Sequence, residues 1–157
     1  MSDTVQVVSF KLGSEEYGVD IAQVQEINRM VSVTHVPRAP QFMEGVINLR
    51  GQLIPIIDLR ARFGMPRTEH TKNTRIVVTE IGTKRVGMVV DSVSEVLRLP
   101  TDQIEDAPEM ITGVDTEYIR GVGKIEDRLI ILLDLAKIIS TSEKRDLEST
   151  EVEAAVA

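Results

Sequence analysis

The sequence predicts a mainly β protein made of two small antiparallel barrels, and three observations support this fold class. The chain has 157 residues, which fits one compact domain or two small ones that share a core. Val and Ile contribute most to the 42% of hydrophobic residues while aromatic residues make up only 3%, and branched aliphatic side chains favour strands. Short apolar segments separated by turn residues also recur along the chain, and its second half repeats its first.

The internal repeat is the most informative of these features. Glycine and aspartate recur at matched positions together with the aliphatic residues, so two similar substructures explain the match better than a chance alignment of aliphatic strands. The matching segments are 45–59 with 121–135, which lie 76 residues apart, and 12–19 with 81–88 and 24–27 with 93–96, which lie 69 residues apart.

Local signals place four strands and two short helices in the first half. Asp20 and Asp58 each precede a helical stretch, the first through Gln25 and the second over 59–63, because a carboxylate there accepts hydrogen bonds from the unpaired N–H groups of the first turn. Gly51 lies in a tight hairpin turn over 50–52, where it can adopt a positive φ. The expected strands are 5–12, 17–19, 46–49 and 53–57.

The second half repeats this plan, and its last strand is apolar at every position. Such a strand, 129–133, and its counterpart 53–57 differ from an antiparallel strand with one wet face, which would alternate. We therefore expect both to be covered on both faces by the packing of the two barrels, with a bulge or an unpaired edge at Pro55. The other expected strands are 75–81, 86–90 and 119–125, and Asp134 is expected to cap a helix that ends near Ile139.

The expected organisation is a single domain over residues 1–140, followed by a C-terminal tail. The domain would contain two pseudo-symmetric barrel subdomains, roughly 5–70 and 71–140, which can exchange elements. Residues 141–157 hold five acidic and two basic residues and few large apolar ones. Such a segment buries too little surface to offset the entropy of ordering, so the tail is expected to be flexible or marginally helical.

Composition excludes several classes of function. No cysteine is present, which rules out disulfides, thiolate metal sites and cysteine nucleophiles. The formal net charge of −7 argues against general binding of nucleic acid, whose phosphates an acidic surface repels. No uncharged apolar run approaches the roughly 18 residues that span a bilayer, and residues 1–4 lack the features of a signal peptide. The chain is therefore expected to act in the cytoplasm without inserting into a membrane.

No catalytic motif stands out. His35 and His70 lie in separate loop-like segments and are interpreted as solvent-exposed, without a metal. Asp58 and Asp134 could form a carboxylate pair, but helix capping explains both. The run 121–124 lacks the spacing of a phosphate loop. We expect a non-catalytic interaction module without a cofactor. An enzyme would instead have a polar pocket with converging titratable groups, and a nucleic-acid binder would have a basic face with stacking aromatics.

Two segments are candidates for a binding surface. Apolar residues Val24, Ile27, Met30 and Val31 surround the expected end of the first helix and are either core or interface. Arg50 should be exposed at its hairpin tip, where it could pair with a carboxylate of a partner. The segment 101–116 has no counterpart in the repeat, and its Met110 and Ile111 either anchor a partner or tie the loop down.

Five runs of the sequence together resemble the CheW family of bacterial chemotaxis coupling proteins. The resemblance covers about residues 5–140, in the family's order. The runs are Glu16-Tyr17-Gly18-Val19-Asp20-Ile21, Val24-Gln25-Glu26-Ile27, Gly45-Val46-Ile47-Asn48-Leu49-Arg50-Gly51, Pro55-Ile56-Ile57-Asp58-Leu59-Arg60 and Val89-Val90-Asp91-Ser92-Val93.

The resemblance implies a fold and a function. The fold that the resemblance implies is two SH3-like five-stranded antiparallel β-barrels packed around a shared core, with short capping helices and a C-terminal helix. Its members are non-catalytic adaptors that join the helical cytoplasmic tip of chemoreceptors to the regulatory domain of a histidine kinase, and they also contact other copies of themselves in array rings. A paralogue that serves an output other than swimming is the alternative, and a member with an appended receiver domain would need a longer chain.

The resemblance also assigns site residues. The family's receptor-contacting positions match Val24, Glu26, Ile27, Arg50 and Ile76. The surfaces that face the kinase and form rings match Glu105, Glu109 and Met110. The family often has a basic residue where this chain has Glu105, so the charge pattern of that contact departs from the family's.

Overall fold

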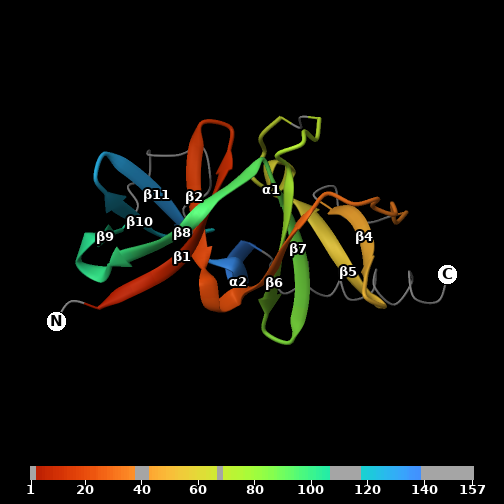
Figure 1. Cartoon of the computed structure of the whole chain (residues 1–157), viewed down its shortest axis with the longest axis horizontal. Helices are drawn as coiled ribbons and strands as arrows, with labels where there is room; N and C mark the ends of the chain where they lie inside the picture. The colour runs from red at the N-terminus through yellow and green to blue at the C-terminus, as the bar shows by residue number, and fades with distance from the viewer. Residues whose placement is uncertain (1–2, 38–42, 67–68, 107–117, 139–157) are drawn as a thin grey trace.

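A computed structural model describes residues 3–37, 43–66, 69–106 and 118–138. Two sheets form two barrels that lie side by side, with short helices between them (Figure 1). The mainly β fold class with two SH3-like barrels is therefore confirmed. The tail 141–157, the end of the last helix at Ile139, and the candidate residues Glu109 and Met110 lie outside the described residues.

Barrel A is a six-stranded sheet in the order β8-β1-β2-β11-β10-β9. It closes because the short helix η2 (Thr101–Gln103) turns the chain from β8 into β9, whose Glu105 pairs with Val122 of β10. Its strands are β1 (Thr4–Leu12), β2 (Glu15–Asp20), β8 (Ser92–Pro100), β9 (Ile104–Glu105), β10 (Ile119–Ile125) and β11 (Arg128–Leu133).

Barrel B is a five-stranded sheet in the order β3-β6-β7-β5-β4. It closes through a bridge between Thr34 and Val46, whose backbone N–H groups each donate to the other's carbonyl oxygen over 2.8 and 2.9 Å. Its strands are β3 (Val24–Arg29), β4 (Met43–Leu49), β5 (Gln52–Asp58), β6 (Arg75–Ile81) and β7 (Lys84–Val90).

Each barrel takes strands from both halves of the chain. β1 and β2 come from the first half but pair with β8 and β11, whereas β3 from the first half pairs with β6 from the second. The two strand orders correspond one to one under the sequence repeat, with β9 as an addition to barrel A. The expectation of purely antiparallel barrels is wrong in one respect, because β2 pairs with β11, and β7 with β5, in parallel. These neighbours are not joined by hairpins, so nothing forces them to run antiparallel.

Three aspartates cap short helices as predicted. The side chain of Asp20 accepts from the Ala22 N–H at the start of η1 (Ile21–Gln23), and that of Asp58 accepts from the Arg60 N–H at the start of α1 (Leu59–Arg62). Asp134 accepts from the backbone N–H of Ala136 in α2 (Leu135–Ile138). Among the described residues, no helix is long and apolar enough to cross a membrane.

Two expectations about the backbone are corrected. The helix after Asp20 does not reach Gln25, because β3 begins at Val24 and its backbone pairs with β6 instead. The segment that follows β8 does have a counterpart in the repeat: Glu105 pairs with Val122 as Thr34 pairs with Val46 in barrel B. Its start is therefore required to close barrel A.

The core has three parts, one inside each barrel and one shared between them. Ile130 and Leu132 of β11 point into barrel A, while Ile131 and Leu133 join the shared core. The apolar strands are thus covered on both faces as expected, except that Leu129 is 49% exposed. A row of aromatic rings crosses the shared core, with neighbouring centroids 5.9–6.0 Å apart: Phe10, Tyr17, Phe63 and Tyr118.

Candidate protein-binding surfaces

β3 is an edge strand, because within its sheet it pairs only with β6. A bulge at Gln25 interrupts the ladder, and exposed and half-buried residues alternate along the strand. Val24 packs against the shared core, whereas the side chain of Ile27 stays 39% exposed. A β-bulge re-aims the side chains around it, so this edge displays both polar and apolar groups.

The hairpin between β4 and β5 brings Arg50 to the same edge. Arg50 and Gly51 both adopt positive φ, of 51° and 83°, and the Gly51 N–H donates to Asn48 Oδ1 over 2.9 Å. The guanidinium of Arg50 is 71% exposed and donates to the carboxylate of Glu26. That hydrogen bond, together with one from Asn28, lowers the pKa of Glu26. We call Val24, Glu26, Ile27 and Arg50 the β3–Arg50 surface.

The fifth candidate position, Ile76, does not line this surface. Its side chain is fully buried inside barrel B, where it packs in one cluster with Ile47, Ile54 and Ile56. The alternation of β6 directs Ile76 and Val78 toward the barrel interior. Ile76 therefore supports the sheet from within and is not available to a partner in this structure.

Glu105 lies on the opposite barrel from the β3–Arg50 surface. It is exposed on β9, and its carboxylate accepts from Lys124 Nζ over 3.0 Å. The lysine partner is itself half exposed, so this ion pair is open to solvent and to a partner.

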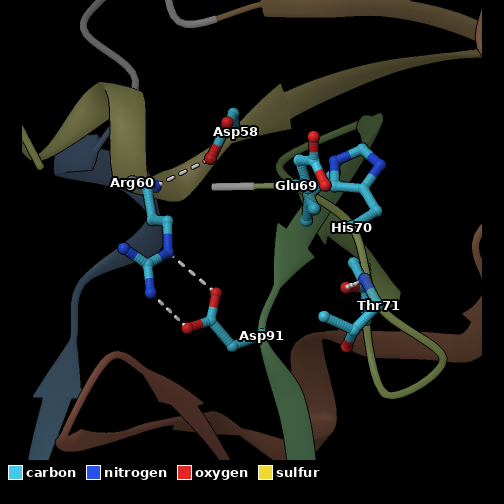
Figure 2. Close-up of a pocket in the computed structure, with 8 residues that line it drawn as sticks. Asp58, Arg60, Glu69, His70, Thr71 and Asp91 are labelled. Atoms are coloured by element: carbon cyan, nitrogen blue, oxygen red, sulfur yellow. Dashed lines mark hydrogen bonds and ion pairs between the residues drawn. The ribbon is translucent and has the colours of Figure 1, made fainter. Parts of the chain in front are cut away.

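A cavity of about 150 Å³ near the junction of the barrels is lined by several titratable groups, including Glu69 and His70. Figure 2 shows the Arg60 guanidinium facing both carboxylate oxygens of Asp91, with Glu69, His70 and Thr71 across the cavity. Arg60 donates to Asp91 over 2.8 and 2.5 Å, and this hydrogen bonding lowers the pKa of Asp91.

The same carboxylate connects the two barrels. Asp91 Oδ2 also accepts from the N–H of Gly13, in the turn between β1 and β2 of barrel A, over 2.8 Å. Arg60 lies in α1, which follows β5 of barrel B. We call Arg60, Asp91 and Gly13 the inter-barrel clasp. Both oxygens of its carboxylate accept hydrogen bonds that link the two barrels. This favours a structural role for the side chains of the polar cavity over a catalytic one.

The two histidines are exposed as expected, and the two aspartates cap helices as expected. His35 and His70 are exposed, and His70 Nε2 lies 3.7 Å from Glu44 Oε1. Asp58 and Asp134 each cap a helix. Within the described part of the chain, no group of three or more His, Asp or Glu side chains could hold a metal ion. The arrangement is suited to binding other proteins through exposed edges of a rigid body.

Two fused SH3-like barrels with exposed edge strands define a protein-binding module, and comparison with known proteins agrees. The family model described as a CheW-like domain matches residues 6–143. The chain belongs to the CheW-like family, whose members act as scaffolds in chemotaxis.

Similar relatives cover most of this chain and most of their own. The chain is 46% identical to a chemotaxis protein CheW of Klebsiella aerogenes over 134 residues, 85% of this chain and 81% of that protein. It is 34% identical to a CheW of Thermotoga maritima, covering 85% and 87%. The crystal structure of the scaffolding protein TtCheW from Thermoanaerobacter tengcongensis superposes with a TM-score of 0.82 at 38% identity, covering 91% of this chain and 92% of that one.

Proposed function

We propose that this chain is a non-catalytic cytoplasmic adaptor that couples the cytoplasmic tip of chemoreceptors to the regulatory domain of a chemotaxis histidine kinase. One observation carries the proposal: Arg50, which lies 24 residues after Glu26 in the sequence, reaches the edge strand of barrel B that holds Val24, Glu26 and Ile27. Membership of the CheW-like family supports it.

The β3–Arg50 surface fits one helix of a receptor hairpin. Ile27 offers exposed apolar area on one face of β3, while Arg50 and Glu26 supply one charge of each sign on the other face of the same edge strand. An amphipathic helix can lay its apolar face on such an edge, and flanking charges then fix its register. Because the Arg50–Glu26 pair is solvent-exposed, exchanging it for a pair with the partner costs little.

The kinase and neighbouring adaptor copies would bind elsewhere on the same rigid body. Glu105 on barrel A is one proposed contact, with Glu109 and Met110 as further ones. The shared core and the inter-barrel clasp fix the geometry between the two barrels. A receptor state could then alter kinase activity through this body without chemistry on the chain, and tethering would support arrays from individually weak contacts.

The test of the receptor contact is Arg50→Glu, which places like charges at the exposed tip. Binding of a purified receptor cytoplasmic hairpin, measured by calorimetric titration, should weaken about tenfold. Arg98→Glu, the same charge change on an exposed strand of barrel A, is the matched control and should leave the receptor affinity unchanged. Unchanged affinity of the Arg50→Glu variant would reject the assignment.

The kinase side is tested by Met110→Ser. Removing this apolar side chain should reduce co-sedimentation with the kinase and receptor-dependent autophosphorylation, while receptor binding persists. Normal co-sedimentation of the variant would count against Met110 as a contact.

A further inference from the structure

A cationic hollow lies at one end of β3, on a chain whose net charge is −7. It has a volume of about 540 Å³ and is lined by Arg29, Lys72 and Arg75, together with Met30 and polar residues of the 71–74 turn. We call Arg29, Lys72 and Arg75 the cationic cluster. Three cations in one concave site create a local positive potential on a molecule that is acidic overall.

The cluster contains a repulsive pair. The register of β3 and β6 places Arg29 directly opposite Arg75, and like charges at opposed positions destabilise a sheet. Arg75 Nη1 donates to the carbonyl oxygens of Lys72 and Thr74 over 2.8 and 3.0 Å, which holds its guanidinium at the hollow. In the described ranges, no carboxylate forms an ion pair with any member of the cluster.

The fold itself does not require this pair. In barrel A the equivalent positions are Gln6 and Arg98, which oppose each other across β1 and β8 as Arg75 and Arg29 do across β6 and β3. There a neutral glutamine faces one arginine. Barrel A therefore shows that the same strand pairing forms with a single cation and does not depend on a second arginine.

The hollow lies on the face of β3 from which Ile27 of the β3–Arg50 surface projects. Ile27 and Arg29 are two residues apart on one strand, so their side chains project to the same side. Val31 beyond the strand end is 48% exposed, which places an arginine between two exposed apolar side chains. A helix lying along β3 would meet Ile27 first and the cationic cluster about one turn further on.

We propose that the cationic cluster binds the carboxylates of a helical partner segment that carries two or more Asp or Glu side chains beside its apolar stripe. The inference rests on the proposed receptor surface and extends it: the acidic residues of the receptor helix would select the orientation in which it binds. The partner's carboxylates would neutralise the Arg29–Arg75 repulsion, so binding removes a destabilising contact as well as adding ion pairs. Because these groups are solvent-exposed, the contribution is screened by salt.

The probes are two synthetic amphipathic helices of about 18 residues, or five turns, that share one Leu stripe and differ only in three flanking Glu or Gln residues. Fluorescence anisotropy at low salt measures the affinity of each helix for the wild type, Arg75→Gln and Arg98→Gln. Arg75→Gln reproduces the Gln–Arg pair of barrel A, so its melting temperature should equal or exceed that of the wild type. Arg98→Gln removes one cation from barrel A and is the matched control.

The wild type and Arg98→Gln should bind the Glu helix at least about fivefold more tightly than the Gln helix, and Arg75→Gln should reduce this ratio to about two or less. Equal binding of the two helices by the wild type, binding of neither, or an equal loss in Arg98→Gln would overturn the inference. If the Glu helix is selected but Arg50→Glu leaves receptor-hairpin binding intact, the receptor function fails and the acidic-helix site stands. If Arg50→Glu weakens receptor binding but the wild type does not prefer the Glu helix, the receptor function stands and the acidic-helix site fails.

Discussion

The hairpin tips of the two barrels occupy equivalent places in the repeat but hold their charges differently. In barrel A, Arg128 donates to both oxygens of Glu16 and to Glu95 Oε1, the last over 2.7 Å. Barrel B has Gln52 at the position of Arg128, and among the described residues its exposed Arg50 pairs only with Glu26. Arg128 therefore links two carboxylates at the tip of barrel A, whereas Arg50 at the tip of barrel B is largely exposed to solvent.

The backbone irregularities, unlike the charged side chains at the tips, are the same in the two barrels. Gln25 in β3 and Ser94 in β8 are equivalent bulge residues, and Glu44 in β4 and Arg120 in β10 are another such pair. Bulges shape a strand regardless of which outward side chain they carry. The comparison teaches that the duplicated fold constrains the backbone and leaves the edge side chains free to differ between the two barrels.

The largest difference in stability between the two barrels is expected when a glycine is substituted at the point where each barrel closes. A Cβ at Gly45 would lie 2.1 Å from the Thr34 carbonyl oxygen, and its φ is +150°. At the equivalent Gly121 the nearest backbone atom, the Glu105 oxygen, is 3.0 Å away. Gly45→Ala should therefore lower the free energy of unfolding by about 3 kcal/mol or more, and Gly121→Ala by about 1–2 kcal/mol, in urea denaturation. Equal losses would mean that both closures adapt alike.

The inter-barrel clasp gives the next effect, because it occurs only once in the repeat. The positions equivalent to Arg60 and Asp91 are Ala136 and Ala22. We expect Asp91→Asn to cost about 1–2 kcal/mol of unfolding free energy at neutral pH, since it weakens a charge-assisted hydrogen bond that is partly exposed.

The pH dependence of this loss follows from the lowered pKa of Asp91. The stabilisation is complete above the unfolded-state carboxyl pKa, about 3.9, and is lost as the pH falls through the lower folded-state value. The difference between the wild type and Asp91→Asn should accordingly shrink as the pH falls below the unfolded-state pKa of about 3.9. A difference that is independent of pH would show that the carboxylate charge is not what stabilises the clasp.

The smallest effects are expected at the hairpin tips. Arg128→Gln, which copies Gln52 of barrel B, should lower the free energy of unfolding by at most about 1 kcal/mol because the network is partly exposed. Arg50→Gln should leave the denaturation midpoint unchanged, since its pair is solvated. A larger loss of unfolding free energy for Arg50→Gln than for Arg128→Gln would contradict the contrast between the hydrogen-bonded tip of barrel A and the exposed tip of barrel B.

Several elements could be predicted because their signals are local. The capping roles of Asp20, Asp58 and Asp134 need only the adjoining backbone, and each is confirmed. The edge strand β3 was missed because Gln25, Glu26 and Asn28 make it polar and a bulge interrupts its alternation. Its partner strand lies about 50 residues away, so no nearby pattern indicates the pairing.

The sequence by itself determined that two similar halves exist, which segments are strands with two buried faces, and to which family the chain belongs. Only the tertiary structure decided that the halves exchange strands, that Ile76 faces the barrel interior, and that Arg29 faces Arg75. The reason is physical: hydrophobic period and capping act within a few residues, whereas strand order, facing and charge proximity arise from contacts between distant segments.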